Sequence, residues 1–230
     1  LFPYTTLFRS LHEKKICNTT IYACLRYNRA NSNTRYIMKL HIHHIDTYDS
    51  EPIERAVAEM FSELKGPVEG KHVVLKVNLL RKATPDQAVT THPVVVEAVA
   101  RYFVSRGAKV TIADSPGGPS HLGQLMSIYR ASGMERAASN SGASLNNSLT
   151  SVSVTLPEAR TLREFPILEV FHEADLLINI AKLKTHGMMT YTGAVKNLFG
   201  VIAGLSKASH HLKLQEPDRK STRLNSSHIT

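Results

Sequence analysis

The sequence predicts an α/β fold in which a mostly parallel sheet is flanked by helices. Three short apolar runs, at residues 72–77, 109–114 and 175–180, have the length and continuous apolar character of strands buried on both faces. Segments with the spacing of amphipathic helices lie between them, and this alternation is typical of a parallel sheet with helical crossovers. A chain of 230 residues has the length of a single domain.

The individual elements follow from periodicity and from residues that begin or end helices. Residues 39–45 alternate apolar and polar side chains, as a strand with one buried face does. Ser50 is expected to cap a helix over residues 51–64, and Thr91 to cap a second helix over residues 92–106. We expect further helices near residues 121–130, 134–140 and 192–203, and short strands with turns over residues 143–170.

Both ends of the chain differ from its middle and are interpreted as foreign sequence. Residues 1–37 show no steady period, and residues 220–230 show no core pattern. Both segments resemble translated sequencing adapters, the alternative being disordered native tails. We therefore expect the natural domain to lie within residues 38–219, to begin at Met38 and to be truncated at its C-terminus, which leaves the predicted sheet incomplete.

The basic character of the chain is concentrated in its ends. The formal charge is +9 and the isoelectric point is about 9.6. Residues 1–37 hold six Lys/Arg and one acid, and residues 220–230 hold two Lys/Arg and no acid, so residues 38–219 carry only +2. This near balance, without a run of Lys or Arg, argues against nucleic acid as a partner.

Apolar-run length and cysteine positions exclude other classes of protein. No run approaches the roughly 18 apolar residues of a membrane span, and the first residues lack the features of a signal peptide. We therefore expect no membrane partner and a cytoplasmic location. The two cysteines, Cys17 and Cys24, precede residue 38, so residues 38–219 offer no thiolate for a disulfide or a metal.

Polar residues that suit the handling of an anion follow each of the three predicted buried strands. The carboxyl ends of parallel strands meet at one edge of a sheet, where ligands bind. Ammonium groups supply point charges there, and hydroxyl groups and the backbone of a Gly-rich turn supply donors for a phosphate, a carboxylate or a nucleotide. The candidate catalytic residues are Asp114, His186 and Lys184. The candidate ligand-binding residues are Lys76, Ser115, Lys182, Thr185 and Lys196.

Several of these residues have a simpler structural interpretation. Lys76 is equally explained as a side chain that reaches solvent from a strand end, and the Gly-rich segment 114–118 as a tight turn. His92 stands at a helix start, where capping or solvent exposure fits at least as well as ligand binding. Three further histidines lie on the predicted strand at residues 39–45, where we favour surface exposure over a metal site: His41, His43 and His44.

Four ordered stretches resemble one family, named domain of unknown function 362, over about residues 38–219. They are KVNLL (76–80) with TTHP (90–93), ADSPGGP (113–119), INIAKLKTH (178–186) and TGAVKNLFG (192–200). The resemblance implies further ligand-binding positions at Asn78, Thr91, His92, Gly117, Asn197 and His211. Val77 and Ala181 depart from it, since the family usually has proline at both positions.

The same resemblance implies a redox context. Members of the family are often joined to, or described as, iron–sulfur ferredoxin-like proteins. A 4Fe–4S cluster would then belong to a part of the protein beyond residue 219, because no cysteine within residues 38–219 can hold one. A ferredoxin-type module or another electron-transfer protein is the partner that this implies.

Three functions are compatible with these features. The first, which we favour, is a redox-associated domain that binds a small anionic substrate or cofactor through Lys76, Lys184 and Lys196. The second is a non-catalytic anion-binding or regulatory module that uses the same pocket. The third is a metal-dependent hydrolase, whose ligands would be Asp114, His186 and His211.

Overall fold

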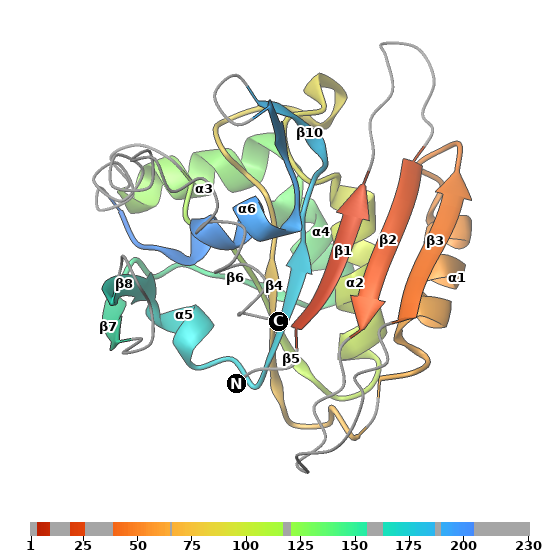
Figure 1. The fold of residues 1–230 in the computed structure, drawn as a ribbon, viewed down its shortest axis with the longest axis horizontal. Helices are drawn as coiled ribbons and strands as arrows, with labels where there is room; N and C mark the ends of the chain where they lie inside the picture. Colours follow the sequence, from red (N-terminus) through yellow and green to blue (C-terminus); the bar gives the residue numbers. More distant parts are fainter. Residues whose placement is uncertain are drawn as a thin grey trace.

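A computed structural model describes residues 4–9, 19–25, 39–64, 66–116, 121–155, 163–186 and 190–204 of the chain. It has a central sheet with helices on both faces (Figure 1). This architecture confirms the predicted α/β class.

Seven strands form the central sheet, in the order β3-β2-β1-β9-β4-β5-β6. Strands β9, β4, β5 and β6 pair in parallel, β1 is also parallel to β9, and β2 and β3 complete the sheet in antiparallel pairs. Two hairpins, β7–β8 and β10–β11, lie outside it. The bounds are β1 Tyr4–Arg9, β2 Thr19–Leu25, β3 Lys39–Ile45, β4 His72–Lys76, β5 Lys109–Ala113, β6 Ser144–Leu145, β7 Ser151–Thr155, β8 Glu164–Leu168, β9 Leu176–Ile180, β10 Lys184–His186 and β11 Thr190–Thr192.

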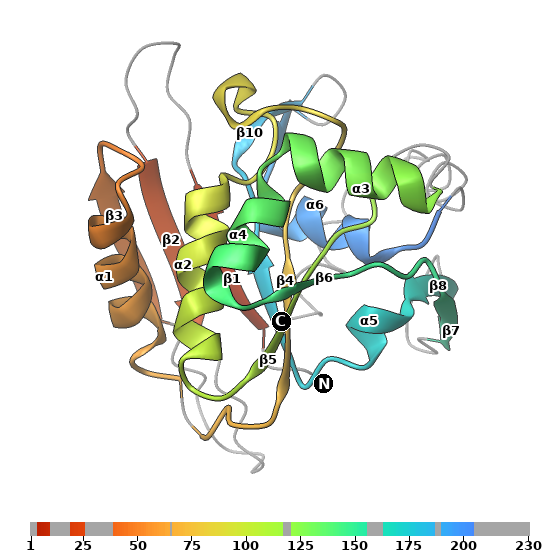
Figure 2. The ribbon, with the colours of Figure 1, turned by 180° about the vertical axis from the view of Figure 1, so that it is seen from behind.

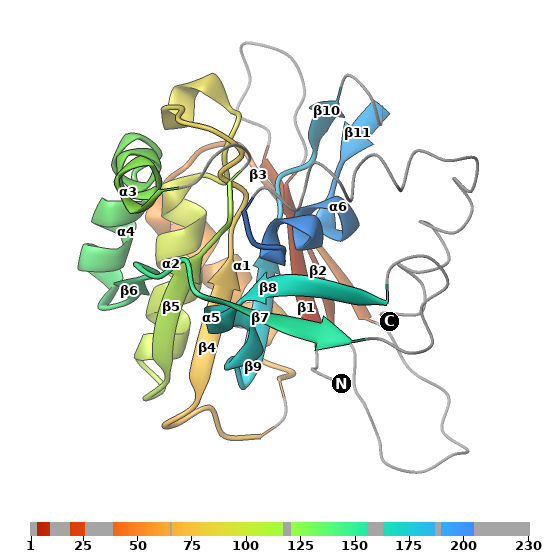
Figure 3. The same cartoon turned by 90° about the vertical axis from the view of Figure 1, so that its left-hand side faces the viewer.

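The helices form a layer on each side of the sheet. Helices α1 (Ser50–Phe61), α2 (Pro93–Val104), α3 (Leu122–Ala131) and α4 (Met134–Ser141) lie on one face, which is turned to the viewer in Figure 2. Helices α5 (Glu169–His172) and α6 (Ala194–Leu198) and the β7–β8 hairpin lie on the other, as the side view shows (Figure 3). Two 3₁₀ turns, η1 Pro85–Gln87 and η2 Phe199–Val201, complete the described elements.

Alternating side chains of the central strands enter two separate cores. Val73 and Leu75 of β4 join the larger core under α1 to α4, whereas Val74 between them joins the smaller core with α5. Strand β9 divides its side chains in the same way, with Ile178 in the first core and Leu177 in the second. Burial on both faces explains why these strands are continuous apolar runs rather than alternating ones.

Helix α1 shows how the sequence specifies one covering helix. Its buried residues recur at the three- and four-residue spacing of a single helix face: Ile53, Ala56, Val57, Met60 and Phe61. The predicted starts of α1 and α2 were each wrong by one residue. Asp49 takes the N-cap position of α1 in place of Ser50, and His92 that of α2 in place of Thr91, whose hydroxyl group is used elsewhere.

The strand order reverses beside β4, and this reversal defines where a ligand site is expected. From β4 the chain passes through α2 to β5 and through α3 and α4 to β6, moving steadily outward. It then returns by way of α5, on the other face, to place β9 on the opposite side of β4. In doubly wound sheets such a switch point opens a crevice at the carboxyl ends of the two strands. Those ends point to the top of Figure 1, where β10 continues from β9.

Strands β1 and β2 were not predicted, because residues 1–37 show no steady period. Their β-branched and aromatic content, in YTTLFR and TTIYACL, favours strands once a neighbouring sheet edge is present. β1 pairs with the edge of β9, and β2 then joins β1 to β3. The interpretation of residues 1–37 and 220–230 as foreign concerns the origin of the chain and stays a prediction.

Candidate functional site

Lys76, at the end of β4, forms a buried ion pair with Asp114, which directly follows β5. Lys76 Nζ lies 2.7 Å from Asp114 Oδ1, and the two side chains are 1% and 4% exposed. The same ammonium group donates to the carbonyl of Val77 at 2.6 Å and to Asn197 Oδ1 at 3.2 Å. Burial lowers the pKa of Lys76, and the Asp114 carboxylate opposes that shift. All three protons of the ammonium group therefore have partners inside the protein.

Asp114 is held as firmly as Lys76. Its Oδ2 accepts from the backbone N–H of Leu79 at 2.7 Å, and its Oδ1 accepts from the backbone N–H of Ser115 at 2.8 Å. These charge-assisted bonds fix the loops that follow β4 and β5. Because Asp114 and Lys76 neutralise each other, the geometry favours a positioning role for both side chains. The anion contact expected for Lys76 and the catalytic role expected for Asp114 stay predictions.

A glycine is required at position 200 because η2 packs directly against the ion pair. A Cβ atom added to Gly200 would lie 2.6 Å from Asp114 Oδ1 and 2.6 Å from Lys76 Nζ, which is closer than real contacts of this kind. The carbonyl of Gly200 also accepts from the backbone N–H of Ser115 at 3.1 Å. The segment after α6 therefore closes over the ion pair with backbone atoms alone.

Three asparagines connect the ion pair to the neighbouring strand and helix. Asn197 Nδ2 donates to Asn179 Oδ1 at 2.7 Å and to the carbonyl of Lys76 at 3.3 Å. Asn78 Nδ2 donates to Asn197 Oδ1 at 3.0 Å, and Asn179 Nδ2 donates to the carbonyl of Ala194 at 2.9 Å. These bonds fasten α6 to the ends of β4 and β9.

Lys184, the first residue of β10, reaches back toward the loop that follows β4. Its Nζ donates to Asn78 Oδ1 at 2.8 Å and to the carbonyl of Val89. The buried hydroxyl group of Thr91 supports the same loop, since it accepts from the backbone N–H of Asn78 at 2.8 Å and donates to the carbonyl of Ile180 at 2.8 Å. The end of β9 and the loop after β4 are thus held together around the Lys184 ammonium group.

Lys184, Lys196 and Arg81 bring three positive charges together at this edge. The pKa of Lys184 is lowered to about 8, first by burial and then by the charge of Lys196, with a smaller contribution from Arg81. Burial also lowers the pKa of Lys196. Among the described residues, Asp114 is the carboxylate that raises the pKa of Lys184, and it is already paired with Lys76. The edge therefore has an excess of positive charge.

The structure gives the other predicted site residues different surroundings. Lys182 and Ser115 are buried at this edge, at 1% and 4% exposure, whereas Thr185 is exposed on β10. His92 caps α2 by accepting the backbone N–H two residues further on at 3.4 Å, and its ring stacks on Tyr48 with 3.4 Å between centroids. This geometry bears out the capping interpretation of His92.

Three predicted residues are only partly covered by the structure. His186 is described through its backbone in β10, but its side chain lies outside the described part of the chain. Gly117 and His211 lie outside the described residues altogether. The roles predicted for these residues stay predictions.

Two residues at this edge, one of the hydrogen-bond network and one of the group of positive charges, were not among the predicted site residues. Asn179 is fully buried within the apolar run LLINI, and a single polar residue in a strand buried on both faces is the signal that identifies it. Arg81 stands only three residues after Asn78, in the loop expected to line the site. Gly200 is part of a family motif, but only the packing of η2 on the ion pair reveals why glycine is needed there.

These features define a doubly wound α/β domain with a lysine-rich polar site at the point where its strand order reverses. The chain matches the family described as Domain of unknown function (DUF362) over residues 73–227. This match covers more than half of the chain and includes β4, β5, β9 and α6, which carry the site. The chain belongs to this family, as its ordered motifs predict.

One curated relative is the thylakoid-associated protein sll1697 of Synechocystis sp., which is 33% identical over 153 residues. The similarity covers 63% of this chain and 43% of that protein, so the chain spans less than half the length of this relative. No solved structure matches the chain. Within the described ranges, no helix is both long and apolar enough to cross a bilayer. The cytoplasmic location expected from the sequence stays a prediction.

Proposed function

We propose that this domain binds a small anionic molecule, with a phosphate or carboxylate group, at the carboxyl ends of β4, β5 and β9. The observation that carries this proposal is the grouping of Lys184, Lys196 and Arg81 beside the topological switch point. Switch points are where doubly wound domains bind their ligands, because loops from opposite directions separate there.

The local balance of charge supports an anion as the ligand. Lys184 is half-buried and is destabilised in its charged form by burial and by the charge of Lys196. Asp114 does not offset this excess of positive charge fully, because Lys76 already neutralises it at 2.7 Å. An anion placed against Lys184 and Lys196 would form charge-assisted hydrogen bonds and relieve the repulsion between the two ammonium groups.

The hydrogen-bond network supports a site that is organised before a ligand arrives. Asn78 accepts from Lys184 and donates to Asn197, which also bonds Lys76 and Asn179. Because these bonds join different elements, the Lys184 ammonium group is already held in place before a ligand binds. Such preorganisation reduces the entropic cost of binding.

We propose further that in the longer protein this anion is the substrate or cofactor of a redox reaction. Lys184 would act as a proton donor, since its pKa of about 8 lies close to neutral pH. An iron–sulfur cluster would belong to another segment or to a ferredoxin-type partner, because residues 38–219 contain no cysteine. Anaerobic reconstitution of the longer protein with iron and sulfide tests this. Anion binding without a cluster signal would favour a non-catalytic binding module instead.

Titration calorimetry with phosphate and with sulfate tests the anion site directly. We expect saturable binding whose Kd rises about tenfold or more in Lys184→Met, because a charge-assisted hydrogen bond is worth about 1.5–3 kcal/mol. The matched control is Lys71→Met, which removes an exposed positive charge just before β4, at the amino ends of the parallel strands and opposite the proposed site. Equal weakening in both variants would mean that the loss of affinity comes from net charge and not from a contact with Lys184. The absence of saturable binding would overturn the proposal.

The metal-dependent hydrolase has no supporting observation in the described part of the chain. Both carboxylate oxygens of Asp114 are already engaged, by Lys76 and by two backbone N–H groups. A metal at Asp114 would have to displace this buried ion pair.

A further inference from the structure

Two histidines of β3 share one face of the strand and meet an acidic residue of α1. His41 and His43 alternate with the exposed Ile42 and lie on the same side as Ile45, which enters the core under α1. The two imidazole rings are parallel within 5°, with 6.3 Å between centroids. Glu59 faces them from α1, with one carboxylate oxygen 3.9 Å from His43 Nδ1.

The possible ligand atoms of this cluster are close enough to share one ion. One atom from each of His41, His43 and Glu59 can be chosen so that all three lie within 4.8 Å of one another. In a tetrahedral zinc site with metal–ligand bonds of about 2.0–2.1 Å, ligand atoms lie roughly 3.3 Å apart. The Glu59 side chain is 65% exposed and has room to turn toward the two rings, and binding of an ion would require the three ligand atoms to move closer together.

One nitrogen of each imidazole is buried. The Nε2 atoms of His41 and His43 are both buried, and neither has a hydrogen-bond partner among the residues that the structure describes. An unsatisfied buried nitrogen is costly, and the neutral imidazole is the commonest metal ligand in proteins. Their neighbour His44 differs, because it points to the other face, is 60% exposed and pairs with Asp46 at 3.2 Å.

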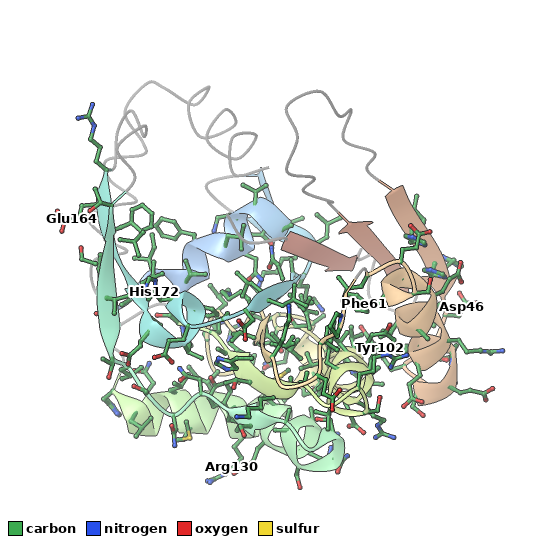
Figure 4. The ribbon with its side chains drawn as sticks, turned by 90° about the horizontal axis from the view of Figure 1, so that it is seen from below. Asp46, Phe61, Tyr102, Arg130, Glu164 and His172 are labelled. Carbon is green, nitrogen blue, oxygen red and sulfur yellow. The ribbon has the colours of Figure 1, made fainter. Side chains whose placement is uncertain are left out.

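We propose that His41, His43 and Glu59 bind a divalent transition-metal ion, with Zn²⁺ the best match to two imidazoles and one carboxylate. Three protein ligands leave a fourth position for water or another donor. The ion would join α1 to β3, which β2 and β1 separate from β9 and the proposed anion site in the central sheet. In Figure 4, Asp46, the residue that follows β3, lies on the opposite side of the molecule from Glu164 and His172. Surface exposure was expected for all three histidines of β3, but His41 and His43 are half-buried on the face that meets α1, and His44 is exposed.

A titration of the full chain with Co²⁺, monitored by visible absorption, is the first test. We expect one equivalent to bind with the strong visible bands of a four-coordinate ion, and Zn²⁺ to displace it. His43→Ala and His41→Ala should abolish these bands, and Glu59→Gln should weaken binding by about tenfold or more. His44→Ala is the matched control, since it removes the adjacent imidazole from the opposite face of the same strand, and it should bind as the unaltered chain does.

The histidines near the end of the chain provide the competing explanation. His210→Ala combined with His211→Ala should leave the absorption bands unchanged. Loss of the bands in that variant, or their persistence in His43→Ala, would overturn the proposed site. Thermal unfolding with and without Zn²⁺ guards against misfolded variants. Without metal, Glu59→Gln should melt like the unaltered chain, and Zn²⁺ should raise its Tm less than that of the unaltered chain. An equal Zn²⁺-induced rise in Tm for both proteins would contradict the proposal.

Discussion

Replacing Lys76 by methionine tests whether the buried ion pair holds the switch-point edge together. The substitution removes the ammonium group but keeps most of the side-chain volume, so Asp114 stays buried at 4% exposure without its charged partner. Removal of one member of a buried pair typically costs about 3–5 kcal/mol. Asp114 retains the backbone N–H groups of Leu79 and Ser115 as donors, so we expect a loss near the lower limit, about 3 kcal/mol.

Urea unfolding followed by circular dichroism measures this loss. With a denaturant slope of about 2 kcal/mol/M, a loss of about 3 kcal/mol lowers the unfolding midpoint by about 1.5 M. Asp114→Asn leaves the Lys76 ammonium group buried without its counter-charge, and we expect a similar loss. The double variant contains neither charge, so it should be no less stable than either single variant, and the cycle should yield a coupling energy of at least about 3 kcal/mol.

A matched control separates this effect from the removal of any lysine. Lys109→Met replaces an exposed lysine at the start of β5 and should change stability by no more than about 0.5 kcal/mol. The reasoning is refuted if the losses of the two single variants simply add in the double variant. It is also refuted if Lys76→Met is as harmless as Lys109→Met.

Three further predictions concern the same edge of the sheet. Gly200→Ala should lower the free energy of unfolding by about 1–3 kcal/mol through overpacking against the ion pair. Gly123→Ala within α3 should instead raise the free energy of unfolding by up to about 1 kcal/mol. Thermal denaturation of both variants distinguishes steric crowding from a general effect of alanine. Thr91→Val should cost about 2–3 kcal/mol because two buried hydrogen bonds are lost, and Thr91→Ser, which keeps the hydroxyl group, should recover most of that loss in urea unfolding. Lys184 is charged below its pKa of about 8 and loses its proton above it, so sulfate affinity should be constant below about pH 8 and fall by up to tenfold per pH unit above it. Calorimetry between pH 6.5 and about 9.5 measures this profile. The same fall in Lys184→Met would show that another group titrates.

Much of the architecture could be predicted because burial on two faces leaves a clear pattern. The runs at residues 72–77, 109–114 and 175–180 correspond to β4, β5 and β9, and the alternation with helices correctly implies parallel pairing. The short hairpin strands β10 and β11 carry no such pattern, because each has only three residues. Strand β1 depends on a free edge of β9, which is a property of the assembled sheet and not of the β1 sequence.

The candidate site could be located from the sequence, but the division of roles within it could not. Topology alone brings the ends of β4, β5 and β9 together, so Lys76, Asp114 and Lys184 were all expected at one edge. Whether a lysine faces a ligand or a buried carboxylate depends on distances of a few ångströms between segments far apart in the sequence. Lys76 pairs with Asp114, whereas Lys184 lies beside Asn78 and close to the positive charges of Lys196 and Arg81. No local sequence pattern separates these two cases.

The position of β9 in the sheet has a consequence for the order in which the protein forms. Strand β9 is synthesised after β4, β5 and β6, yet it pairs directly with β4 in the interior of the sheet. The hydrogen bond between Lys76 and Asn197 likewise joins residues 121 positions apart. During translation, the edge of β4 and the polar groups of Lys76 must therefore wait for more than a hundred residues to emerge. Contacts of such long range fold slowly, and a waiting strand edge is open to wrong partners. A nascent chain that stops before β9 should therefore be a better substrate for chaperones than the same chain extended through Gly204.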